Sequence, residues 1–147
     1  MSFEFSLSKE APMKRRAILT SVLLGACLLA AGCGSGSNPL APFSPEIISN
    51  ADSFQFQITD GKNVTVTETY TWTNPTNGVS VDHSTAKTDG GASMVIRDAS
   101  GVQVYSSELK ASGSEQSISG NPGDWTVQVI FSNFDGTANF RVEKLPL

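Results

Sequence analysis

Residues 64–73 read Val-Thr-Val-Thr-Glu-Thr-Tyr-Thr-Trp-Thr. Threonine occupies every second position, and large apolar side chains occupy all but one of the positions between. Because successive side chains of a strand point to opposite faces, one face of this stretch is apolar and the other is hydroxylated. The stretch therefore predicts a β-strand that covers a core. Glu68 shares the apolar face, so we expect it at a strand edge or an open end of the core and not in a catalytic site.

The same alternation recurs through the rest of residues 46–147. The further alternating apolar runs are 54–58, 94–96, 102–104, 125–131 and 138–142. Turn-forming pairs such as Asp60-Gly61 and Asp135-Gly136 separate these runs. No part of this segment shows helical periodicity. We therefore predict an all-β domain, an antiparallel β-sandwich of about seven or eight short strands.

The second half of this domain resembles the small sandwich domains found at the ends of secreted bacterial proteins, including the pre-peptidase C-terminal type. The resemblance rests on residues 96–101 (Ile-Arg-Asp-Ala-Ser-Gly), residues 122–127 (Pro-Gly-Asp-Trp-Thr-Val) and the closing strand 136–142. It implies a β-sandwich and adds no site residue.

The beginning of the chain has a different character. Met13 is followed by Lys14, Arg15 and Arg16, and then by an apolar run, 17–31, that ends at Gly32-Cys33. A basic segment, an apolar run and small residues before a processing point make up a secretory signal peptide, which we place at residues 13–32. The alternative is a plain membrane anchor, but the run is shorter than the roughly 20 residues of a transmembrane helix.

Residues 28–33, Leu-Leu-Ala-Ala-Gly-Cys, resemble the lipobox of bacterial lipoproteins, with Ala30 where that family usually has leucine. The resemblance implies that Cys33 is acylated and becomes the new N-terminus, so that several acyl chains hold the protein in a membrane. Residues 24–27, Leu-Gly-Ala-Cys, are a competing match that would make Cys27 the acceptor. We prefer Cys33, because cleavage before Cys27 would leave an apolar mature N-terminus. By the same resemblance, Gly34 after the cysteine favours the outer membrane of the cell envelope.

The flanks of the leader set the domain boundaries. Residues 1–12 contain two acidic residues and fit no part of a signal peptide, so we expect Met13 to be the true start. Residues 33–45 contain the acylated cysteine and a linker rich in glycine, serine and proline, which we expect to be flexible. The sandwich is predicted to span residues 46–147.

Charge and cysteine content exclude several classes of function. The chain has a net charge of −4, which divides into +2 before Cys33 and −6 from Cys33 onward. An acidic mature protein has no electrostatic attraction to nucleic acid, so we expect no such partner. Both cysteines precede the domain, so it holds no disulfide, thiol nucleophile or cysteine metal site. The turn aspartates lack a dense calcium-loop pattern, and we predict no metal and no cofactor.

The sequence contains no convincing set of residues for catalysis or for a surface on which sugar rings could stack. His83 is the one histidine, and its neighbour Asp82 would point to the opposite side of an extended chain, so we expect a surface-loop histidine and no enzyme activity. The alternation predicts burial of Trp72 and Trp125 and exposure of Tyr105. The five threonines of residues 65–73 resemble the threonine ranks of ice-binding proteins, but those surfaces need several ranks side by side. A solvent-facing strand is the prediction.

These observations predict a lipid-anchored envelope protein whose non-catalytic β-sandwich acts through protein contacts or as a structural component. Its expected partners are the membrane, through the acyl chains on Cys33, and an envelope protein or polysaccharide. The alternative function is a surface carbohydrate-binding module, which needs two or more exposed aromatic rings on one face. A third function, an enzyme, needs a cleft that converges on His83 or Glu68.

Overall fold

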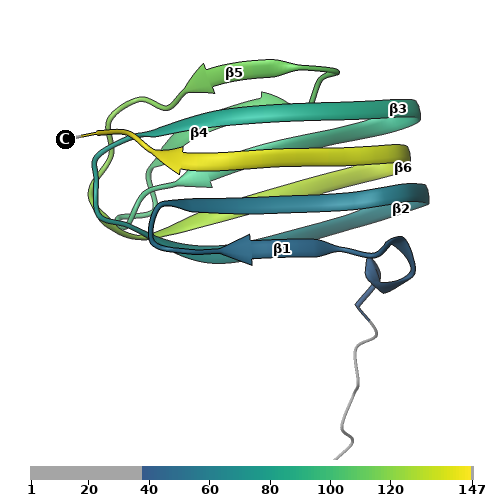
Figure 1. Ribbon diagram of the computed structural model, residues 1–147, viewed down its shortest axis with the longest axis horizontal. Coiled ribbons are helices and arrows are strands. Elements are labelled where there is room, and N and C mark those ends of the chain that lie inside the picture. Colours follow the sequence, from purple (N-terminus) through teal and green to yellow (C-terminus); the bar gives the residue numbers. More distant parts are fainter. Residues whose placement is uncertain (1–37, 147) are drawn as a thin grey trace, which may run out of the picture. The chain divides into compact units, whose positions relative to one another are not determined.

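The structure is a computed structural model that describes residues 38–146 (Figure 1). The leader and Cys33 lie outside the described residues. The described part contains a 3-10 turn and six strands: η1 (Ala41–Phe43), β1 (Glu46–Ser49), β2 (Ser53–Asn74), β3 (Val79–Arg97), β4 (Gln103–Glu108), β5 (Gly113–Gln116) and β6 (Gly123–Lys144). All strand pairings are antiparallel. The predicted all-β antiparallel architecture is confirmed.

Three of these strands are long enough to take part in both layers of the sandwich. The strand order is β1-β2-β6-β3-β4, with β5 also paired to β3. The first half of β2 pairs with the second half of β6, and the second half of β2 pairs with the first half of β6. Figure 1 shows β2, β3 and β6 bending back at the same end of the molecule. One sheet therefore folds over on itself into two layers.

We call these layers A and B. Layer A holds β1, β5, the first halves of β2 and β3, and the second half of β6. Layer B holds β4, the second halves of β2 and β3, and the first half of β6.

The corner between the layers explains why the strands are fewer and longer than expected. Asp60-Gly61 and Asp135-Gly136 do change the direction of the chain, but neither closes a hairpin. The ladder continues from β2 to β6 through the pair Gly61 and Gly136, with register shifts on both sides of Gly61. Asp60 and Gly136 have φ values of 52° and 145°, which bend their strands at one level. The turn residues therefore move each strand from layer A to layer B with its neighbours still paired.

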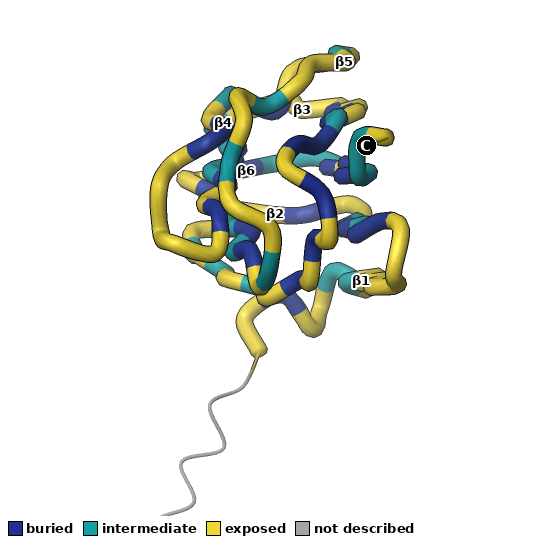
Figure 2. The backbone as a smooth tube through the Cα atoms, turned by 90° about the vertical axis from the view of Figure 1, so that its left-hand side faces the viewer, coloured by how far each residue is buried: buried dark blue, intermediate teal, exposed yellow. Residues whose placement is uncertain are grey.

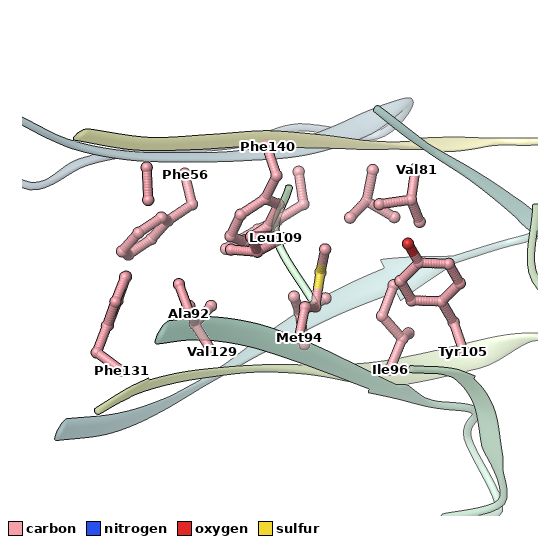
Figure 3. Packing of buried hydrophobic residues seen from close by; sticks show 14 of the residues in the cluster. Phe56, Val81, Ala92, Met94, Ile96, Tyr105, Leu109, Val129, Phe131 and Phe140 are labelled. Carbon is pink, nitrogen blue, oxygen red and sulfur yellow. The ribbon is translucent and has the colours of Figure 1, made fainter. Parts of the chain in front are cut away.

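The space between the layers is filled by apolar side chains (Figure 3). Phe56 and Phe140 descend from layer A and stack with ring centroids 5.2 Å apart, while Phe131 rises from layer B to within 6.1 Å of Phe56. Figure 2 shows the matching alternation of buried and exposed residues along the strands. Trp72 and Trp125 are 2% and 0% exposed, as their positions in the alternation predict.

The folded part begins earlier than residue 46, the start of the domain predicted from the sequence pattern. Leu40 is completely buried in the core, and its backbone N–H donates to Oδ1 of Asn38 at 2.9 Å. The η1 turn follows directly, with Phe43 packed against the core. Part of the segment expected to be a linker therefore belongs to the sandwich.

Candidate functional site

The longest regular strand edge without a partner lies on β2. Residues Phe54–Gln57 pair with β1 on one side and with β6 on the other. From Val66 to Asn74, nine consecutive residues pair with β6 without a register shift, and no strand of the described residues pairs with their other side. We call residues 66–74 the β2 edge. An unpaired regular edge presents backbone N–H and C=O groups to which another strand can bind.

The threonines beside this edge face solvent, as predicted. Thr65, Thr67, Thr69, Thr71 and Thr73 are all exposed on the outer face of layer B. Three of them bond to side chains of β6: Thr73 Oγ1 donates to Asp124 Oδ1 at 2.7 Å, Thr65 Oγ1 to Asn133 Oδ1 at 3.1 Å, and Gln128 Nε2 donates to Thr69 Oγ1 at 3.3 Å. The row therefore joins the edge to its neighbouring strand.

Glu68 is on the inner face of the β2 edge, half-buried, between Val66 and Tyr70. Its register partner on β6 is Val129, which is fully buried. Burial, reinforced by the charge of Glu68, raises the pKa of Tyr70 to about 12. No ion pair within residues 38–146 includes Glu68. The prediction that this carboxylate lies at a strand edge is confirmed.

The prediction for His83 is wrong. It is part of β3 and only 5% exposed, because the alternation of Val79 and Val81 continues through it. Its Nδ1 lies 3.3 Å from the carbonyl oxygen of Lys110, and its Nε2 has no hydrogen-bond partner among the described residues. Gly113 packs directly on the ring, since a Cβ atom there would lie 2.5 Å from Nε2. Asp82 is exposed on the opposite face, so the two side chains form no catalytic pair.

The prediction for Tyr105 is also wrong: it is 7% exposed, and its hydroxyl donates to Glu115 at 3.0 Å. The register between β3 and β4 shifts between Ile96 and Arg97. This irregularity puts consecutive residues Val104 and Tyr105 both into the core and leaves Val102 54% exposed.

The two buried tryptophans have hydrogen-bond partners. Trp72 and Trp125 donate from their indole nitrogens to backbone oxygens of Asn50 and Asn121, each at 2.7 Å.

The turn aspartates Asp98 and Asp135 accept hydrogen bonds from backbone N–H groups. Asp98 accepts from the N–H groups of Ser100 and Val102 at 2.9 Å, and from Asn121 at 2.8 Å, which holds the pKa of this carboxyl below its ordinary value. The N–H of Asn63 likewise lowers the pKa of Asp135, helped by Lys62. Among residues 38–146, no three histidine, cysteine or acidic side chains converge to hold a metal ion.

Two hollows are lined by residues outside the β2 edge. A cleft of about 650 Å³ lies beside the corner of β3, with Lys87, Asp89, Glu108 and Lys110 among its lining residues. A shallower hollow of about 200 Å³ lies on the outer face of layer A, lined by polar side chains that include Asp82 and Arg141. Neither hollow is lined by a tryptophan or tyrosine.

No helix of the described part is long and apolar enough to cross a membrane.

The sequence pattern singled out two parts of this site, the threonine row and Glu68, but not the free edge itself. Whether a strand has one neighbour or two depends on the pairing of distant segments. The presence of a charge among inward-facing apolar residues was the signal that pointed to an edge.

Comparisons with known proteins do not assign the chain to a family. No protein-family model matches the chain, and no curated protein matches it. Two similar solved structures are carbohydrate-binding modules. TmCBM61, in complex with beta-1,4-galactotriose, is 14% identical with a TM-score of 0.36, over 68% of this chain and 66% of that one. The C-terminal CBM6 of LamC, a marine laminarinase from Zobellia galactanivorans, is 7% identical with a TM-score of 0.32, over 71% of this chain and 95% of that one.

Proposed function

We propose that this chain is a lipid-anchored envelope protein whose non-catalytic β-sandwich binds a partner protein by adding a strand of that partner to the β2 edge. The observation that carries the binding proposal is the run of nine regular residues, Val66–Asn74, with one side unpaired among the described strands. Strand addition uses main-chain hydrogen bonds for affinity and side-chain positions for specificity.

The leader supports the anchor. Basic residues, a short apolar run and the sequence Leu-Leu-Ala-Ala-Gly-Cys end at Cys33. Six residues separate Cys33 from Leu40, the first buried residue of the sandwich. A chain of this length spans at most about 25 Å. An acylated Cys33 would therefore keep the domain close to the membrane surface, where a partner in the envelope can reach it.

A polypeptide suits the β2 edge better than a polysaccharide does. Sugar stacking needs exposed aromatic rings, whereas Trp72, Trp125 and Tyr105 are all buried. Tyr70 is half-buried, with its ring packed against Phe54 and Phe56. A polysaccharide would depend on polar side chains in the two hollows, with no ring to stack on. The β2 edge instead presents a row of backbone donors and acceptors, which another extended backbone matches directly.

Metabolic labelling tests the anchor. The full chain is expressed in a bacterial host with labelled palmitate, as wild type and as the variants Cys33→Ser and Cys27→Ser. We expect label and membrane partitioning in the wild type and in Cys27→Ser, and loss of both in Cys33→Ser. Retention of label by Cys33→Ser would assign the acyl chains to another residue, and an unlabelled wild type would refute the anchor.

Site-specific photocrosslinking in the envelope tests the binding surface. A photoreactive residue is placed at Thr67 or Thr71, beside the β2 edge, and at Ser84 on the outer face of layer A as a matched exposed control. We expect the same protein adduct from both edge positions and none from Ser84. Equal adducts from all three positions, or adducts from Ser84 alone, would contradict the proposed surface.

A further inference from the structure

The β2 edge carries a single charge. Within residues 66–74, Glu68 is the one ionisable side chain apart from Tyr70, and there is no lysine or arginine. The inner face presents Val66, Glu68, Tyr70, Trp72 and Asn74 in order along the strand. Any strand that adds to this edge must therefore accommodate one carboxylate among apolar neighbours.

The position of Glu68 makes its carboxylate important for which strand can bind to the β2 edge. In the free protein it is half-buried, so water still reaches it from the open side of the sandwich. An added strand would cover this side and remove part of that water. A carboxylate that loses water without gaining a counter-charge is costly, whereas one that gains a lysine or arginine is compensated.

We propose that the β2 edge selects a partner strand that places a lysine or arginine opposite Glu68 on its inward face, and that the same carboxylate prevents two copies of this chain from pairing edge to edge. This inference rests on the proposed strand addition, and it names the chemistry of the partner. Charge complementarity decides the occupant, because no other inward-facing position of the β2 edge carries a charge: Val66, Tyr70 and Trp72 are apolar or aromatic, and Asn74 is a neutral amide.

Two copies of this chain cannot pair through their β2 edges without burying Glu68 of both copies. Two β2 edges that pair with their inner faces on the same side must match inward-facing residues with inward-facing residues. Glu68 then lies opposite Glu68, Val66, Tyr70, Trp72 or Asn74 of the other copy. Each of these registers buries two carboxylates without a cation, and the first also places like charges directly opposite each other. A second copy is therefore excluded.

Peptide binding tests the selection. The probes are three nonapeptides with blocked ends: Thr-Val-Thr-Lys-Thr-Val-Thr-Val-Thr, and the same sequence with Glu or Leu in place of Lys. The full chain is purified in a nonionic detergent, and binding is followed by calorimetry and by amide exchange. We expect the Lys peptide to bind about tenfold more tightly than the Glu peptide, and to slow exchange at residues 66–74.

The two proposals fail in different ways. If no peptide slows exchange at residues 66–74, the proposed strand addition is wrong. If the Lys, Glu and Leu peptides protect these amides with equal affinity, strand addition stands and the role of Glu68 is refuted.

Variants at Glu68 provide the second test. Glu68→Lys should reverse the preference, so that the Glu peptide binds more tightly, and Glu68→Gln, which keeps the shape, should remove the preference. Glu68→Val should convert a monomer into dimers or larger species in sedimentation experiments. Thr69→Val adds a similar apolar group on the outer face of the same strand and should remain monomeric. A monomeric Glu68→Val protein with native circular dichroism would overturn the exclusion of self-pairing.

Discussion

Gly61 of β2 lies opposite Gly136 of β6 at the level where both strands pass from layer A to layer B. At this level the backbones approach so closely that a Cβ atom on Gly136 would lie 2.1 Å from the carbonyl oxygen of Ala86, on the neighbouring strand β3. Gly136 also has a φ of 145°, a conformation that side chains rarely adopt. The pair of glycines thus allows three strands to bend together.

Replacement of Gly136 by alanine should destabilise the protein by about 2–4 kcal/mol, because the added methyl group meets the backbone of β3 and the φ value is strained. Urea unfolding followed by circular dichroism measures the loss. Gly91→Ala is the matched control, since nothing lies within 4 Å of its Cβ position, and it should change the free energy of unfolding by less than about 1 kcal/mol. Equal losses in the two variants would show that the corner does not depend on Gly136.

Trp125 should contribute strongly to stability. Its side chain is 0% exposed, and its indole nitrogen donates to the backbone of Asn121. Trp125→Ala should cost about 3–5 kcal/mol, because it leaves a large cavity and removes the hydrogen bond from the indole nitrogen to Asn121. Ile118→Ala, at a position that is 65% exposed, should cost less than about 1 kcal/mol. Thermal unfolding of both variants checks this difference, and a small loss in Trp125→Ala would contradict the packing described here.

Asp98 should make the protein less stable in acid. Its pKa is lowered in the folded state by hydrogen bonds that the backbone N–H groups of Asn121, Val102 and Ser100 donate to it. A carboxyl with a lowered folded-state pKa stabilises the fold above its unfolded value of about 4, and this contribution disappears as the pH falls through the folded value. Asp98→Asn should therefore be less stable at neutral pH and show a weaker decline in stability below pH 4. If the stability of this variant falls below pH 4 as steeply as that of the wild type, other groups cause the decline, and Asp135 is the next candidate.

Both tyrosines should resist ionisation. Burial raises the pKa of Tyr70 and of Tyr105 to about 12, with Glu68 and Glu115 as further causes. Because the folded-state values lie above the unfolded value of about 10, the protonated tyrosines stabilise the fold below pH 10, and this contribution is lost as the pH rises toward 12. Absorbance near 295 nm should show little tyrosinate at pH 10.5 in the native protein and much in urea.

Glu68→Gln should lower the pKa of Tyr70 and leave that of Tyr105 unchanged, because Glu68 faces Tyr70 alone. Tyr105→Phe is the control that isolates the titration of Tyr70. A Tyr70 titration that is identical with and without the carboxylate would show that burial alone sets its pKa.

The local sequence pattern predicted many residues of the core, but it did not predict the corner between layers A and B. The alternation correctly placed Trp72 and Trp125 inside and the threonines of residues 65–73 outside, because strand geometry alone fixes the face of each residue. It failed at Tyr105, which a register irregularity between β3 and β4 puts into the core beside Val104, and at His83, which continues a strand where a polar loop was expected. Asp60-Gly61 has the composition of a hairpin turn, and only the neighbouring strands decide that it forms a corner instead.

The chain's own residues predicted an export leader ending at Cys33. They determined a strand-rich domain and the charge at Glu68 among apolar neighbours, since each depends on residues within a few positions. The tertiary structure alone decided that one sheet folds into two layers, that Leu40 belongs to the core, and that residues 66–74 have a free side. Those properties depend on which distant segments pair, and the energies of pairing are shared between residues that lie far apart along the chain.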